Sequence, residues 1–241
     1  MPPPIRTADA PPGLATNRIL RLLTAPERER LAGSGEVIAL SQGQVLQETG
    51  TEIDCVYFPL SGVLSMLTVL STGQAIEVAS IGREGFAGLP VFLGARIATT
   101  RTLVQVDGHA LMLESEDFRR EMRGEGRLAV LLARYAELLF VSAAQTTACN
   151  RVHSVRERCA RAILTWHDRL DRDILPVTQD ALAEALGVRR ASVTEAIRDF
   201  VEAGAVRRGR GRMYVLRRRA LEEFACECYA TIQDAFERET G

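Results

Sequence analysis

Short apolar or alternating runs, separated by turn-forming residues, fill the chain from about residue 36 to residue 113. The runs are VIAL, QVLQ, CVYFPL, GVLSMLTVL, AIEVASI, TRTLVQV and HALML, and the segment STGQ at 71–74 is one of the turns between them. Runs of this length and alternation are typical of β-strands. A series of short strands with turn signals predicts an antiparallel β-roll of the jelly-roll type, an architecture suited to a sensor module.

Helical spacing replaces this pattern at 127–150, a stretch without glycine or proline. Residues at intervals of three and four form an apolar stripe along it. The stripe consists of Leu128, Leu131, Tyr135, Leu138, Ser142 and Gln145 and continues to Cys149. Such a stripe usually packs into its own subunit, but it also suits a coiled-coil dimer seam. We favour the dimer seam, because the DNA-binding motif described next ordinarily acts in pairs. Further helices are expected at 17–31, 153–170 and 219–239.

The segment 178–217 predicts a helix-turn-helix followed by a hairpin. Thr178 is a suitable N-cap for a helix over 179–186, and Gly187 supplies a turn where positive φ is cheap. The expected inward residues of the two helices are Leu182, Ala183, Leu186, Val188, Val193, Ala196 and Ile197. After Gly204, the stretches around Val206 and at 213–216 predict two strands that flank the basic tip RRGRGR, the form of a DNA-binding wing.

Charge supports DNA as the partner of this segment. Residues 188–219 hold ten arginines and three acidic residues, in a chain whose net charge is −1 and which contains no lysine. A solvated helix face usually mixes its signs, whereas a basic block favours polyanions. We expect Arg190, Ser192, Thr194 and Glu195 to read bases. The expected phosphate contacts are Thr178, Gln179, Arg189, Arg198, Arg208, Arg210 and Arg212.

Length and composition limit the number of domains and argue against a membrane or secreted protein. With 241 residues the chain can hold two modest domains. No apolar run approaches the roughly 20 residues of a membrane span, and no secretory signal is visible at the N-terminus, so a cytoplasmic protein is expected. The expected organisation is a proline-rich tail at 1–16, a sensor roll at 17–126, a dimerisation helix at 127–150 and a DNA-binding domain at 151–241.

The five cysteines are scattered, so neither disulfides nor a metal site is expected. Cys226 and Cys228 fall in an expected helix, where residues two apart point to different sides and would not share a metal. The histidines, His109, His153 and His167, are interpreted as packing or surface residues, and no haem or metal is assigned.

The order of roll, long helix and winged helix-turn-helix resembles the Crp/Fnr family of bacterial transcription regulators over about residues 17–216. The similarity is strongest at 178–206, and it extends to VYFPLSG at 56–62 and IGREGFAG at 81–88. The latter is similar to the start of the family's phosphate-binding cassette. The resemblance implies a homodimer that binds pseudo-palindromic DNA and is gated by a signal at the roll, with RNA polymerase as a further partner. The effector-binding residues it implies are Gly85, Phe86, Gly88, Thr99, Thr100 and Arg101.

Several positions depart from the family pattern. Cyclic-nucleotide members follow the last cassette glycine with a glutamate for the ribose and a leucine, whereas this chain has Leu89 and Pro90. Cyclic AMP is therefore not favoured, although another cyclic nucleotide stays open and no cofactor is assigned. The clustered N-terminal cysteines of the iron–sulfur members are absent. In the recognition helix, Ala191 and Glu195 replace the family's usual residues, which predicts a different operator.

The sequence thus predicts a non-enzymatic, DNA-binding transcription regulator of mixed α and β structure. Two alternatives stay open. One is an adaptor that keeps the fold without binding DNA. The other is a cupin-like metalloenzyme, which would need several histidines and carboxylates in the roll, where His109 is the one histidine.

Overall fold

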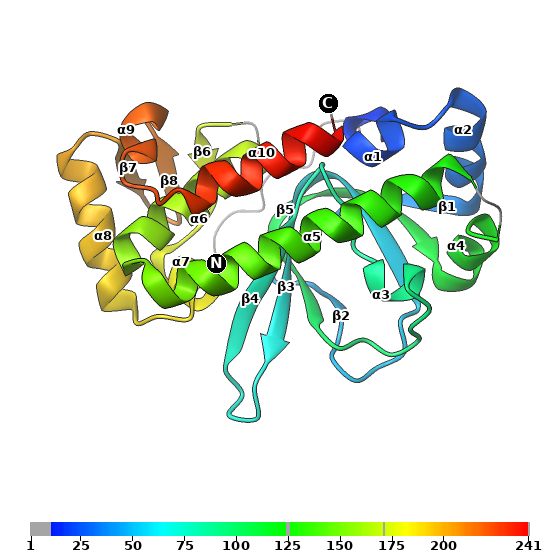
Figure 1. Ribbon diagram of the computed structural model, residues 1–241, viewed down its shortest axis with the longest axis horizontal. Coiled ribbons are helices and arrows are strands. Elements are labelled where there is room, and N and C mark those ends of the chain that lie inside the picture. Colours follow the sequence, from blue (N-terminus) through cyan, green and yellow to red (C-terminus); the bar gives the residue numbers. More distant parts are fainter. Residues whose placement is uncertain (1–10, 124–125, 171, 241) are drawn as a thin grey trace.

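The computed structural model describes residues 11–123, 126–170 and 172–240 (Figure 1). Its N-terminal part begins with a 3-10 turn and two short helices, η1 (Leu14–Thr16), α1 (Arg18–Arg21) and α2 (Ala25–Ser34). The strands of the first sheet are β1 (Gly35–Leu40), β2 (Val45–Gln47), β3 (Cys55–Val69), β4 (Ala75–Ile81) and β5 (Arg101–Glu114). Two short helices, α3 (Leu89–Phe92) and α4 (Ser115–Glu121), accompany them. We call residues 14–121 the roll.

The rest of the described chain is mainly helical. The helices are α5 (Arg127–Val152), α6 (Val155–Leu170), α7 (Gln179–Leu186), α8 (Arg190–Glu202), α9 (Arg218–Glu222) and α10 (Cys228–Thr240). A second sheet consists of β6 (Ile174–Leu175), β7 (Val206–Gly209) and β8 (Arg212–Val215) in the order β6-β8-β7. We call the unit α6–α9 with this sheet the winged domain. The predicted α+β architecture is confirmed.

The first sheet is antiparallel throughout, in the order β1-β5-β3-β4 with β2 also paired to β5. Two predicted pairs of strands each form one long bent strand, β3 and β5. The bend in β3 lies at Gly62, where φ is +80° and a Cβ would lie 2.6 Å from the carbonyl oxygen of Val106. Gly62, which separates the predicted strands CVYFPL and GVLSMLTVL, is therefore a kink within one strand, while the predicted turn at 71–74 does join β3 to β4.

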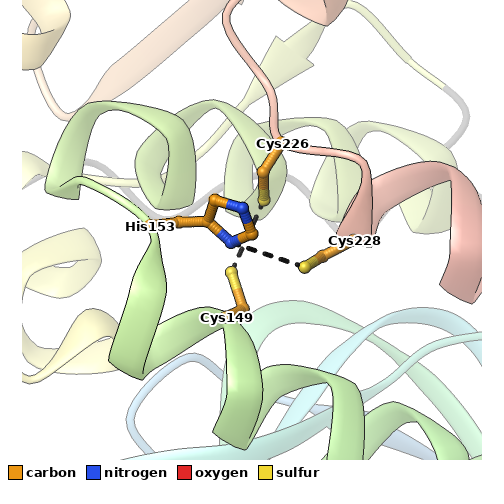
Figure 2. A group of neighbouring side chains, drawn as sticks. All are labelled: Cys149, His153, Cys226 and Cys228. Carbon is orange, nitrogen blue, oxygen red and sulfur yellow. Dashed lines mark hydrogen bonds between the residues drawn. The ribbon is translucent and has the colours of Figure 1, made fainter.

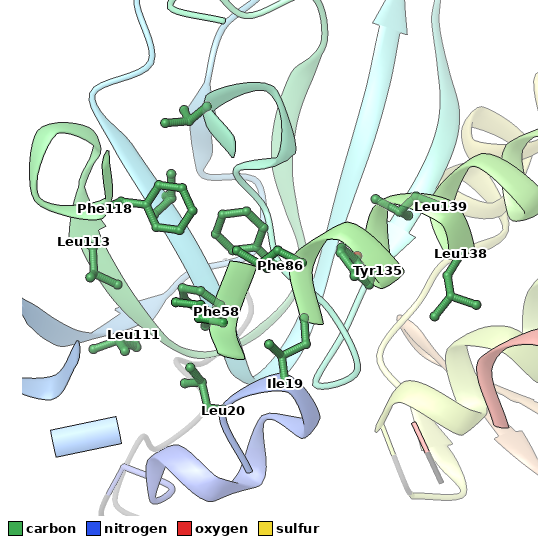
Figure 3. Packing of buried hydrophobic residues seen from close by; sticks show 14 of the residues in the cluster. Ile19, Leu20, Phe58, Phe86, Leu111, Leu113, Phe118, Tyr135, Leu138 and Leu139 are labelled. Atoms are coloured by element: carbon green, nitrogen blue, oxygen red, sulfur yellow. The ribbon is translucent and has the colours of Figure 1, made fainter. Parts of the chain in front are cut away.

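An aromatic cluster fills the roll (Figure 3). Phe86 lies between a tilted Phe58 ring and a stacked Phe118 ring, with ring centroids 4.6 and 5.1 Å away. The inward face of α5 closes this core through Leu132, Tyr135 and other buried residues. The sheet, the cassette segment and α5 therefore share one core, so a change at the roll can reach the long helix by direct contact.

Two expected helices are broken in the structure. The helix expected at 17–31 is split into α1 and α2, because Pro26 starts a new helix and Glu27 accepts a hydrogen bond from the backbone N–H of Thr24 at 2.9 Å. The helix expected at 219–239 is split into α9 and α10. The second break matters for function, because it places Cys226 outside a helix.

Helix α10 returns to the roll and lies along α5 (Figure 1). Its residues Ile232, Ala235 and Phe236 belong to the roll core. The expected domain boundary, which assigned 151–241 to the DNA-binding domain, therefore does not follow the packing at α10. The expected tail also differs, since 14–16 form η1, while residues 1–10 lie outside the described part.

Among the described helices, α5 is the one long and apolar enough to cross a membrane by length and composition. The sequence reasoning that no run approaches this length missed it. One face of α5 is buried against the roll and α10, as in the core helix of a globular protein, which meets the same criterion.

Candidate nucleic-acid interface

The turn between α7 and α8 forms as predicted. The Thr178 hydroxyl accepts a hydrogen bond from the backbone N–H of Ala181 at 3.1 Å and caps α7. Gly187 adopts φ +63° at the end of α7, a conformation that a residue with a Cβ rarely takes. This tight turn sets α8 across α7, with its own N-terminus in solvent.

All but one of the predicted inward residues of the motif are buried, and Val188 is half-buried. Leu182, Val193 and Ile197 are completely inaccessible, and Ala183, Leu186 and Ala196 are nearly so. They pack with α6 and the short sheet in one core. The apolar residues of α8 therefore face the core, and its polar residues face solvent. The polar face can enter a DNA groove while the apolar face stays buried.

The wing is a short hairpin of β7 and β8 around Arg210 and Gly211. Gly211 has φ +69°, which permits the tight reversal. The guanidinium of Arg207 lies 3.8 Å from the centroid of the Tyr214 ring, a cation–π contact that stiffens the hairpin. The arginines at the tip therefore extend from a rigid support.

A groove runs between the start of α7, the start of α8 and the wing. Its lining includes Thr178, Gln179, Arg190, Thr194, Arg208 and Arg212, all predicted DNA contacts. The Thr194 hydroxyl donates to the side-chain oxygen of Gln179 at 2.8 Å, which joins the two helices at the groove floor. Residues that are far apart in sequence thus line one basic concavity.

The remaining predicted DNA contacts surround this groove or lie along α8. The exposed members of the whole set are Thr178, Arg189, Arg190, Glu195, Arg198, Arg208, Arg210 and Arg212, and Gln179, Ser192 and Thr194 are half-buried. Arg190 forms an ion pair with Asp180, in which Nε of Arg190 lies 3.3 Å from the Asp180 carboxylate. Both side chains are about two-thirds exposed, so a phosphate or base can displace this contact.

The structure does not bring all of the predicted effector-binding residues to one site. Gly88 and Thr100 line a small cavity between β3, β5 and the start of α3. Phe86 does not line it, because its ring is completely buried in the aromatic core. Gly85 faces α5, where an added Cβ would collide with the Tyr135 hydroxyl. Thr99 is exposed.

Arg101, the expected phosphate ligand, is held by a carboxylate. Its Nε donates to both oxygens of Glu48, at 2.9 and 3.0 Å. The hydrogen bond from Arg101 is the largest cause of the lowered pKa of Glu48. An anion at this position would have to displace Glu48 from Arg101.

A buried ion pair joins the roll to the winged domain. The Nε of Arg169, on α6, donates to Glu84 at 2.7 Å, and the two side chains are 9% and 11% exposed. Burial acts to raise the pKa of Glu84, but the charge and hydrogen bond of Arg169 and the backbone N–H of Gly82 hold that pKa below its ordinary value. Beside this pair, Ile76 of β4 contacts the α7–α8 turn, 3.6 Å from the site of a Cβ on Gly187.

The predicted dimer seam lies largely on the wrong face of α5. Leu128, Tyr135 and Leu138 are buried in the roll core of their own subunit. Leu131 packs partly against the same core, while Ser142 and Gln145 are half-buried. The three-and-four spacing is common to core stripes and dimer seams, so it could not distinguish them. The outward face instead presents Val130 and Phe140, which are 53% and 75% exposed.

Four potential metal ligands that the sequence reasoning did not combine lie together (Figure 2). Cys149 and His153 come from the end of α5, Cys226 from the loop before α10 and Cys228 from the first position of α10. Cys226 and Cys228 do not point to different sides of one helix as predicted, because Cys226 lies before the start of α10. Cys149 lies in the last turn of α5, and His153 directly follows this helix and donates its backbone N–H to the Cys149 carbonyl at 3.0 Å. The spacing of four between positions 149 and 153 was therefore the signal in the sequence.

Comparison with protein families agrees with this geometry. Residues 37–125 match the cyclic nucleotide-binding domain, and residues 157–224 match the Crp-like helix-turn-helix domain. The two matches and the basic groove define a DNA-binding regulator with a sensor of the cyclic nucleotide-binding type. The chain belongs to the Crp/Fnr family of transcription regulators.

Solved structures share the fold. FixK2 from Bradyrhizobium japonicum aligns with a TM-score of 0.69 at 15% identity, over 80% of this chain and 98% of FixK2. TTHB099, a CRP-family transcriptional regulator from Thermus thermophilus, aligns at 0.64 and 21%, over 78% and 96%. The c-di-GMP responsive regulator CLP from Xanthomonas campestris aligns at 0.66 and 11%, over 80% and 99%. The search of curated proteins gives no match.

Proposed function

We propose that this chain is a homodimeric, sequence-specific regulator whose affinity for promoter DNA is set by a signal at the roll. The observation that carries the proposal is the groove in which the starts of α7 and α8 meet the wing arginines. A cytoplasmic location follows from the DNA target. The adaptor and metalloenzyme alternatives lack an observation that favours them over this groove.

In the proposed complex, α8 enters the major groove and the wing contacts flanking phosphates. Arg190, Ser192, Thr194 and Glu195 read base edges, with an arginine fork suited to guanine and a carboxylate suited to the cytosine amino group. The other exposed arginines of the set neutralise phosphates, which fix the register of the protein on the duplex. Two copies place their recognition helices at half-sites about 34 Å apart.

A DNA titration tests this assignment. A site is first selected from random duplexes, and affinity is then measured by fluorescence anisotropy at several salt concentrations. Arg190→Ala should cost about 1–3 kcal/mol on the selected site and relax one base position. Arg208→Ala should weaken selected and random duplexes alike and reduce the salt slope by about 0.9. Arg30→Ala, which removes the same charge from the roll, should leave binding unchanged.

An absence of salt-dependent binding to any duplex would reject the regulator and favour the adaptor. Equal losses for Arg190→Ala on selected and random DNA would make Arg190 a phosphate contact.

The dimer is proposed to form through the outward face of α5. Phe140 is the most exposed large apolar side chain on that face. Phe140→Asp should therefore give a monomer by multi-angle light scattering. Leu93→Asp, which places the same charge at a roll position that is 68% exposed, should leave the dimer intact. A wild-type monomer, or equal effects of the two variants, would refute this interface.

The proposed signal acts through contacts that already connect the roll to the winged domain. A ligand near Gly88 and Thr100 would shift the cassette segment that carries Glu84, and Glu84 holds α6 through Arg169. Thermal unfolding against cyclic mononucleotides, cyclic dinucleotides and haem tests for the ligand. At 100 times its Kd, a ligand of the native state contributes about 2.7 kcal/mol. No shift with any compound would reject all three ligand classes.

A further inference from the structure

Three thiols and an imidazole meet where α5, α6 and the loop before α10 converge (Figure 2). The four ligand atoms of Cys149, His153, Cys226 and Cys228 all lie within 4.8 Å of one another. The three cysteines are buried and the histidine is half-buried. A free cysteine packs as a small hydrophobic side chain, so burial alone does not require that three thiols and an imidazole converge on one point.

The spacing matches one tetrahedral ion. With metal–sulfur bonds of about 2.3 Å and metal–nitrogen bonds of about 2.05 Å, tetrahedral angles place two sulfurs about 3.8 Å apart and a sulfur and a nitrogen about 3.6 Å apart. The sulfurs of Cys149 and Cys226 are 3.5 Å apart, and the sulfur of Cys228 is 3.6 Å from Nδ1 of His153. These two distances match the tetrahedral spacing to within a few tenths of an ångström. The other pairs lie within 4.8 Å, so the ligands would close by at most about 1 Å around the ion.

The surroundings orient the ligands as an outer shell does. Nδ1 of His153 faces the thiols, while its Nε2 lies 3.2 Å from the carboxylate of Glu227. A histidine that donates its second N–H to a carboxylate is the usual partner arrangement of a metal-bound imidazole. The amide of Gln145 donates to the sulfur of Cys228 at 3.1 Å, which suits a thiolate better than a thiol.

Nearby positive charges also favour a bound metal ion with three thiolate ligands. Three thiolates and one divalent ion carry a net charge of −1, which is offset by nearby cations. Arg158 and Arg161 are each 9% exposed, and within the described residues the Nε atoms of both lack a hydrogen-bond partner. The charge of Arg158 acts on Cys149 and Cys226, and that of Arg161 acts on Cys149.

From this geometry we infer that Cys149, His153, Cys226 and Cys228 bind one Zn²⁺ ion in a closed Cys3His site. Nitrogen and thiolate ligands in a tetrahedron, with no position left for substrate, are the donor set of structural zinc. Each cysteine loses its proton to solvent when the ion enters, and no electron is transferred. The ion ties the α5–α6 junction to the loop that starts α10, so it fixes the winged domain relative to the long helix.

Metal content tests the site without any measurement of DNA binding. The full-length protein, purified under reducing conditions without chelators, should contain about one zinc per chain by mass spectrometry of its metals. Replacement by Co²⁺ should give the intense visible bands of tetrahedral cobalt with thiolate ligands. A zinc-free protein without these bands, or one with a disulfide between Cys149 and Cys226, would overturn the inference.

Variants separate binding from folding. Cys226→Ser should lose the metal, whereas Cys55→Ser, a cysteine of the roll, should keep it. If Cys226→Ser does not fold, Glu227→Gln answers the same question, because the Glu227 side chain is 76% exposed and its carboxylate pairs with the proposed ligand His153. Its zinc affinity should fall about 10- to 100-fold in competition with a chromogenic chelator. Unchanged affinity in Glu227→Gln together with full zinc in Cys226→Ser would place the metal elsewhere.

Discussion

Removal of Glu84 should weaken the junction between the roll and the winged domain. Glu84→Ala leaves the Arg169 guanidinium buried without its carboxylate, at a position where only 9% of the side chain is exposed. Loss of one partner of a buried ion pair costs about 3–5 kcal/mol. For a chain of this size that corresponds to a fall in Tm of about 6–20 °C. Because the pair joins two domains, the calorimetric transition should also split into two.

Two comparisons make this result specific. Glu48→Ala removes a carboxylate from an arginine at 2.9 Å, but the side chains of Arg101 and Glu48 are 33% and 43% exposed, so the loss of stability should be much smaller than for Glu84→Ala. The double variant Glu84→Met/Arg169→Met replaces both charges by apolar side chains and should regain most of the stability. The reasoning fails if Glu84→Ala and Glu48→Ala lower the Tm equally, or if the double variant is no better than Glu84→Ala.

The same pair predicts a dependence on pH. Arg169 holds the pKa of Glu84 below its ordinary value of 4.5 despite burial. A carboxylate with a lowered native pKa contributes stability that is fully present above its unfolded-state pKa and is lost as pH falls through the native pKa. The difference in Tm between wild type and Glu84→Ala should therefore stay constant from about pH 8 to pH 6 and shrink below about pH 4.5.

Three further substitutions have defined outcomes. Gly62→Ala forces a Cβ to 2.6 Å from the Val106 carbonyl at positive φ, and should cost about 1–3 kcal/mol in urea unfolding. Phe86→Ala removes the central ring of the aromatic cluster and should cost about 3–5 kcal/mol by the same assay. Asp180→Ala frees Arg190 and removes a negative charge from the groove, so anisotropy titrations should show several-fold tighter DNA binding that fades at high salt. A loss of affinity in Asp180→Ala would mean that Asp180 positions Arg190 for the duplex.

The winged motif was predictable because its constraints are local. A cap at Thr178, a turn at Gly187 and apolar positions at helical spacing all lie within a few tens of residues and were confirmed. The strands were predictable as alternating runs for the same reason. Their fusion into β3 and β5 was not, because a glycine within a bent strand and a glycine in a turn look alike in sequence.

Contacts between distant segments could not be predicted. Glu84 and Arg169 are 85 positions apart, and neither residue has a pattern that selects the other. The break at 223–227 contains no glycine or proline, so RRALEEFACECYATIQDAF has the composition of one helix. Without that break, the cysteines could not be brought to His153. The apolar stripe correctly predicted the helix α5, but it was assigned to a dimer seam and instead packs against the roll. Burial against the roll and burial in a dimer need the same spacing, so the sequence could not distinguish them.

The return of α10 to the roll makes the sensor's core depend on a distant part of the chain. Ile232, Ala235 and Phe236 complete a core whose other residues come from the roll and α5. During synthesis, the roll must wait for roughly 100 more residues, or about 5–20 s at ordinary elongation rates, before that core can close. Until then its apolar face is open to chaperones and to other nascent chains. The winged domain lies between the two parts in sequence, and its core takes in Val63 and Val106 of the roll. It can therefore close on strands that have already been synthesised, while the core of the roll still lacks α10.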